Sequence, residues 1–86
     1  MPEISRFFGI TIRMYFDDHG PPHFHAVYSG TEAVVDVGSP HVTEGDLPGR
    51  AASMVVEWAW LHRSELLENW EALRSGRPAQ KVPPLR

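Results

Sequence analysis

Three histidines lie within seven residues of this chain, in the stretch His-Gly-Pro-Pro-His-Phe-His at residues 19–25. An imidazole can exchange a proton near neutral pH, and a neutral imidazole is the commonest metal ligand in proteins. The two prolines fix their own φ angles and favour extended backbone before them. The sequence therefore predicts a rigid loop that delivers His23 to the start of a strand at a defined angle.

Three strands are predicted around this loop, over about residues 10–16, 23–28 and 31–37. Ser29-Gly30 is a candidate for a two-residue hairpin turn between the last two strands. Side chains alternate between the faces of a strand, so Phe24, Ala26 and Tyr28 are expected in the core and the histidines on the reverse face. The reverse face should gather the following polar residues: Arg13, Tyr15, His23, His25, Glu32 and Asp36, with Asp36 opposite His23.

One hypothesis for this face is acid–base chemistry on RNA, which would make the protein a ribonuclease. His23 and His25 would transfer protons, and Arg13 would neutralise the phosphate. Asp36 would orient the ring of His23. The candidate catalytic residues are therefore His23, His25, Arg13 and Asp36.

A second hypothesis for the same loop is a divalent metal site with a structural role. Its candidate ligands are His19, His23 and His25, and Asp17 or Asp18 in the loop, or Asp36 across the hairpin, could complete the set. No other cofactor is expected. The plain alternative to both hypotheses is that the histidines cover the outer sheet face and bond to loop carbonyls.

The pattern becomes helical over about residues 49–74, and the tail at 77–86 is rich in proline and should be extended. A stripe that includes Val55, Trp58 and Leu66 should face the sheet. A single helix of this length would measure about 39 Å, so a break near residues 62–64 is expected, with Ser64 as the cap of the second piece.

A second apolar strip on this helical segment is too large to leave exposed to water. Its members are Val56, Trp60, Leu67 and Trp70. A second copy of the chain, another small protein or the folded-back tail could cover it. These four residues are the candidates for partner binding.

Composition limits the class of protein. The chain has 86 residues, 42% of them hydrophobic, and it has no cysteine. These values predict one small domain, expected in the cytoplasm, with no membrane span. The net charge of -3 counts against broad, charge-driven binding to nucleic acid. The predicted fold class is α+β, a small antiparallel sheet of three or more strands packed on one face by a long or kinked C-terminal helical segment.

Four stretches of the chain closely resemble the bacterial domain-of-unknown-function family numbered 4160. They are Met-Pro-Glu-Ile-Ser-Arg-Phe-Phe-Gly-Ile at 1–10, Ile-Arg-Met-Tyr-Phe at 12–16, His-Gly-Pro-Pro-His-Phe-His-Ala at 19–26, and the segment from Glu57 to Trp70. The resemblance implies a small bacterial protein, often encoded beside a short family numbered 2442 in an arrangement like a toxin and antitoxin pair.

Residues 21–28, the hairpin, Gly45-Asp46-Leu47 and the helix also resemble, in order, the HicA-type RNA-cleaving toxins. Pro-Pro replaces the Gly-Ser pair of those toxins. On this resemblance His23 occupies the catalytic position. We therefore expect a toxin–antitoxin-like component that acts through a homo-oligomer or a small cognate protein, with an RNA-cleaving or RNA-binding toxin and a metal-binding domain as the alternatives.

Overall fold

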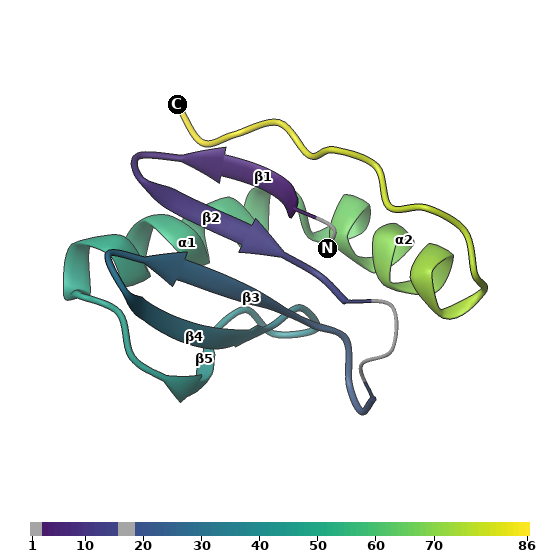
Figure 1. Cartoon of the computed structure of the whole chain (residues 1–86), viewed down its shortest axis with the longest axis horizontal. Helices are drawn as coiled ribbons and strands as arrows, with labels where there is room; N and C mark the ends of the chain where they lie inside the picture. The colour runs from purple at the N-terminus through teal and green to yellow at the C-terminus, as the bar shows by residue number, and fades with distance from the viewer. Residues whose placement is uncertain (1–2, 16–18) are drawn as a thin grey trace.

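The computed structural model describes residues 3–15 and 19–86. In these residues five strands precede two helices: β1 (Glu3–Phe7), β2 (Ile10–Arg13), β3 (His23–Tyr28), β4 (Thr31–Asp36), β5 (Val42–Gly45), α1 (Gly49–Leu61) and α2 (Arg63–Arg74). The strands form one antiparallel sheet in chain order. Both helices lie on the same side of the sheet (Figure 1), which confirms the predicted α+β class.

Two tight turns set the register of the sheet. Phe8-Gly9 connects β1 to β2 and Ser29-Gly30 connects β3 to β4, and all four residues have positive φ. Two successive positive φ values are typical of the type I′ turn, whose twist matches that of the flanking strands. The predicted register of the second hairpin is confirmed, with Tyr28 opposite Thr31 and His23 opposite Asp36.

The core lies between the sheet and α1, with Trp58 near its centre. The Trp58 ring centroid is 5.3 Å from that of Phe7 on β1 and 5.6 Å from that of Phe24 on β3. Phe24 and Ala26 are fully buried, as the alternation predicts. Tyr28 was also expected in the core but is only half-buried, since it ends β3 beside the exposed turn.

The strands differ from the prediction at several points. No strand was predicted before residue 10, but β1 covers Glu3–Phe7. A bulge between Glu3 and Ser5 buries both Ile4 and Ser5, so this strand lacks the strict alternation that identifies β2 and β3. β2 ends at Arg13, β4 ends one residue before the predicted limit, and β5 adds a fifth strand. Phe16, the predicted end of the second strand, lies outside the described residues.

The helical segment breaks at His62, as expected from its length. The cap is His62 itself rather than Ser64, which lies within α2. The His62 N–H still donates to the Trp58 carbonyl at 3.0 Å, and its own carbonyl accepts the Leu66 N–H at 2.9 Å. Nδ1 of His62 lies 2.6 Å from Oε1 of Glu65. One residue therefore terminates α1 and starts α2, and the second helix can run in a different direction.

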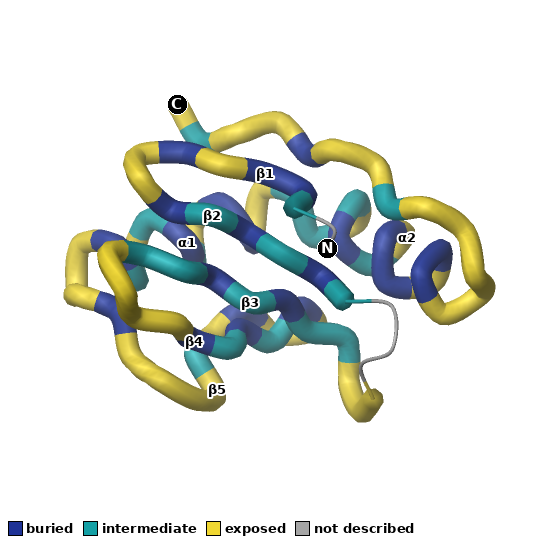
Figure 2. Tube along the Cα trace, viewed as in Figure 1, coloured by how far each residue is buried: buried dark blue, intermediate teal, exposed yellow. Residues whose placement is uncertain are grey.

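The tail returns across the fold and lies beside β1 (Figure 1). Val82 is buried there, and its N–H donates to the Ile4 carbonyl at 2.8 Å. Most other tail residues are exposed (Figure 2). The tail therefore covers the outer edge of β1 with few buried side chains of its own.

Candidate functional site

The predicted histidine pair lies at the start of β3. The ring centroids of His23 and His25 are 5.5 Å apart with an interplanar angle of 61°. His25 is flanked in the sheet by Arg13 on β2 and Val34 on β4. The strand therefore holds two imidazoles close enough to act on one small group such as a phosphate.

Glu32 is the acidic partner of His25. Nδ1 of His25 lies 2.9 Å from Oε2 of Glu32, and Glu32 is opposite Val27, so the contact runs diagonally across the hairpin. A carboxylate only accepts hydrogen bonds, so Nδ1 carries the proton in this contact. The contact therefore orients the ring of His25 through Nδ1.

The ring of His23 contacts a backbone carbonyl. Its Nδ1 lies 2.9 Å from the Pro21 oxygen, so this nitrogen also carries a proton. Asp36 is opposite His23, as predicted, and its carboxylate accepts the Ser39 N–H at 2.8 Å. The Nδ1 contact that orients His23 is therefore made by Pro21, whereas Asp36 holds the following turn.

An aromatic row joins the histidines to the helical layer. Tyr15 packs edge-on against His25 with centroids 4.7 Å apart, and His23 lies 5.0 Å from the ring of Trp70 on α2. His23 was expected on the sheet face away from the helices, and that expectation is only partly correct. α2 lies beside the end of the sheet at which β3 begins (Figure 1), so its Trp70 contacts the first residue of that strand.

Arg13 supplies the positive charge near the pair. It is half-buried and lies opposite His25 on one side and Glu3 on the other. The pKa of Glu3 is lowered, mainly because its carboxylate accepts a hydrogen bond from Arg6 at 2.9 Å, with further attraction from Lys81 and Arg13. Arg13 therefore lies between Glu3 and His25 in the sheet, and its charge is close enough to Glu3 to attract that carboxylate.

The metal hypothesis gains no geometric support from the described part of the chain. Over residues 3–15 and 19–86, no group of three or more His, Asp or Glu side chains is arranged to hold a metal ion. His19 is exposed. Asp17 and Asp18, which could have completed the set, lie outside the described residues.

Among the helices of residues 3–15 and 19–86, none combines the length and hydrophobicity that crossing a membrane requires.

The predicted partner-binding strip does not form one surface. Trp60 is 56% exposed, Val56 and Leu67 are half-buried, and Trp70 is only 3% exposed. The strip was derived for one continuous helix, and the break at His62 places Leu67 and Trp70 on a different helix. The adjacent exposed pair is instead Trp60 with Leu61, which is 65% exposed at the end of α1. Leu61 was not predicted to be part of this surface. Its exposure comes from its position at the last residue of α1 and not from the helical periodicity.

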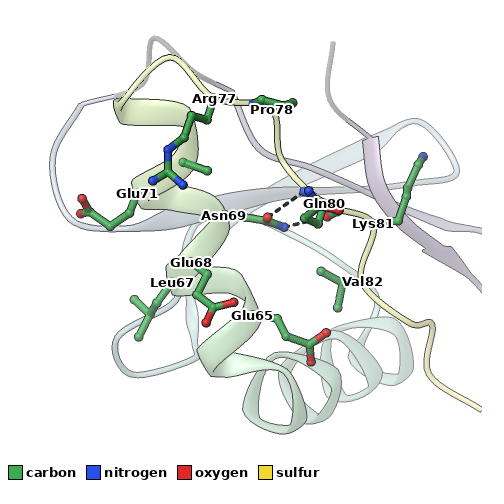
Figure 3. A pocket seen from close by; sticks show the side chains of 11 residues that line it. Glu65, Leu67, Glu68, Asn69, Glu71, Arg77, Pro78, Gln80, Lys81 and Val82 are labelled. Carbon is green, nitrogen blue, oxygen red and sulfur yellow. Dashed lines mark hydrogen bonds between the residues drawn. The ribbon is translucent and has the colours of Figure 1, made fainter.

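A recess lies between α2 and the tail. Figure 3 shows Asn69 reaching from α2 to Gln80 across it. The recess has a volume of about 670 Å³, with Glu65, Glu68, Lys81 and Val82 among the residues that line it. No sequence pattern indicated this site, because the tail was expected to be extended and its folding back over the helical segment was only one of three alternatives.

Comparison with known families identifies a match over residues 9–71, to the model described as "Domain of unknown function (DUF4160)". The chain belongs to this family. The DUF4160 match contains the histidine pair, Trp58 and Asn69, but neither β1 nor the tail. No curated protein and no solved structure matched the chain.

Proposed function

We propose that this protein is one component of a toxin–antitoxin-like pair and acts by binding a partner protein. The observation that carries the proposal is the adjacent exposure of Trp60 and Leu61 at the end of α1. Large apolar side chains grouped on a surface mark interaction sites, and tryptophan is enriched among the residues that dominate binding energy. The gene arrangement implied by the family resemblance supports a small cognate protein as the partner.

The chemistry of this surface defines what the partner must offer. Val56 lies one helical turn before Trp60 and is half-buried, whereas Glu57 is exposed beside it. A complementary surface would have an apolar pocket for the indole and a basic or polar group near Glu57. Burying one large apolar side chain contributes about 1.5–3 kcal/mol, so this pair can supply much of the binding energy of a small interface.

Binding to the protein encoded beside this chain tests the proposal. The two proteins are expressed together, and affinity is measured by titration calorimetry for the wild type, Trp60→Ala and Leu61→Ala. Each variant should weaken binding at least about tenfold, because each removes a side chain that the partner would bury. Phe8→Ala is a matched control, since Phe8 is equally exposed but lies on the β1–β2 turn. Equal affinity of all four proteins would refute this surface.

A second candidate function is histidine-dependent RNA cleavage, which the contact between His25 and Glu32 favours. In such a reaction one imidazole would take the proton of a ribose 2′-hydroxyl, whose oxygen attacks the phosphate. The other imidazole, in its protonated form, would give a proton to the leaving 5′-oxygen. Arg13 would neutralise charge on the phosphate. The ring centroids are 5.5 Å apart, so both imidazoles could contact the same phosphate.

Cleavage of a labelled RNA by the purified protein tests this second function. His23→Ala and His25→Gln should each reduce the rate by about 100-fold or more, as expected for loss of a general acid or base. Glu32→Gln should reduce it less, since it keeps the side chain but alters the contact with His25. His41→Ala is the control, because His41 is exposed and contacts Ser39. Cleavage that survives both histidine substitutions would exclude this chemistry.

A further inference from the structure

The tail is held mainly through its backbone. Nδ2 of Asn69 donates to the Gln80 carbonyl at 2.8 Å, and Oδ1 of Asn69 accepts the Gln80 N–H at 2.8 Å. Nε1 of Trp58 donates to the Pro83 carbonyl at 2.8 Å, and the Ile4 carbonyl accepts the Val82 N–H at 2.8 Å. Four hydrogen bonds therefore hold an extended segment by groups that every peptide possesses.

The groups that hold the tail belong to the rigid part of the fold. Asn69 is only 3% exposed and Trp58 is fully buried, so their polar atoms are fixed in direction by the core. A buried amide that bonds both the N–H and the C=O of one residue recognises an extended backbone rather than a particular side chain. The fold therefore presents a preformed site for an extended strand.

The tail contributes few side-chain contacts that another segment could not make. Val82 is its one buried apolar side chain, and Leu85 and Ala79 are half-buried. Pro78, Pro83 and Pro84 are exposed. Proline favours the extended conformation before binding, which lowers the entropic cost of docking. A different segment with a small apolar residue at the position of Val82 could make the same contacts.

The recess beside the tail leaves room for a second chain to approach. Glu65, Glu68 and Glu71 follow one another at three-residue intervals along α2 and line this recess (Figure 3). Arg77 of the tail points toward this space, whereas Nζ of Lys81 donates to the Glu3 carbonyl at 2.9 Å. A segment that replaced the tail would therefore meet an acidic helix face, which favours lysine or arginine beside its apolar residue.

We propose that the tail occupies a peptide-binding site, and that an extended, proline-containing and basic segment of a partner protein binds there by displacing it. The site shares no residue with the Trp60–Leu61 surface, so the proposal stands independently of that function. The tail competes from within the same chain, at an effective concentration of about millimolar. The wild type should therefore bind such a segment weakly unless the tail is released.

A labelled peptide with the sequence of residues 77–86 tests the proposal by fluorescence anisotropy against the full-length chain. Val82→Asp places a carboxylate where a buried apolar side chain docks, so it should release the tail and bind the peptide at least about tenfold more tightly than the wild type. Gln80→Pro is a second variant, because it removes the N–H that Asn69 accepts without adding a charge. It should act in the same direction.

Two controls define the site. Adding Asn69→Ala to Val82→Asp should reduce peptide binding at least about tenfold, since both hydrogen bonds to Gln80 are lost. A peptide that itself carries aspartate at the position of Val82 should not bind. If Val82→Asp and Gln80→Pro are folded by circular dichroism but bind no peptide, the tail is only a part of the core and the proposal is wrong. A wild-type dimer that exchanges tails would also overturn it, because the occupant would then be a second copy.

Discussion

Asn69→Ala should destabilise the protein by about 2 kcal/mol, because it removes both hydrogen bonds between α2 and Gln80. Each bond is 2.8 Å long, and one intramolecular hydrogen bond contributes about 1 kcal/mol net. Gln80 is exposed, so its backbone groups can bond to water after the change. The decrease in the free energy of unfolding should therefore stay near the sum for two hydrogen bonds. A domain of this length has a total free energy of unfolding of about 4–13 kcal/mol, so the effect is large.

Urea denaturation followed by tryptophan fluorescence measures this loss, and thermal unfolding should show a decrease in Tm of roughly 8–16 °C. Gln80→Ala is the matched control. It shortens an exposed side chain and keeps the N–H and C=O that Asn69 contacts, so it should change stability by less than about 0.5 kcal/mol.

The Asn69→Asp variant tests whether the destabilisation depends on pH in the expected direction. The aspartate lacks the donor for the Gln80 carbonyl, and burial would raise its pKa in the folded state. Its destabilisation should therefore be greatest at neutral pH and decrease as the pH falls through that raised pKa, since the protonated carboxyl can donate again. A loss below about 0.5 kcal/mol for Asn69→Ala would refute the view that this amide holds the tail.

Three further predictions concern the sheet. Gly45→Ala should destabilise by more than about 2 kcal/mol in urea denaturation, because its φ is positive and a Cβ would collide with the carbonyl of Glu32; wild-type stability would contradict this. Phe8→Asn should raise stability by about 0.5–1 kcal/mol, since asparagine tolerates the φ of +50° at this turn; a decrease in Tm would contradict it. Arg6→Ala should lower the urea midpoint slightly at neutral pH, and the difference from wild type should disappear as the pH falls through the lowered pKa of Glu3; a difference that persists in acid would show another cause.

The strands in which apolar and polar residues alternate strictly could be predicted from the sequence. The alternation in β2 and β3 placed Phe24 and Ala26 in the core, and the Ser29-Gly30 turn set the register that brings Asp36 opposite His23. Two local rules therefore located the histidine pair before any tertiary contact was known. β1 was missed because its bulge interrupts the alternation.

Contacts between distant segments could not be derived in this way. The approach of Trp70 to His23 depends on the direction of α2 after the break at His62, which no periodicity encodes. The bonds from Asn69 to Gln80 depend on where the tail lies. The candidate site was therefore predictable along β3, whereas its boundary with the helical layer was not.

The most direct test of the proposed function is light scattering of this protein mixed with the protein encoded beside it. We expect a stable complex of defined stoichiometry, and Trp60→Ala should weaken it at least about tenfold, because the exposed indole would be buried in the interface. Two separate species in the mixture, with Trp60 as accessible to a fluorescence quencher as in the isolated chain, would contradict it.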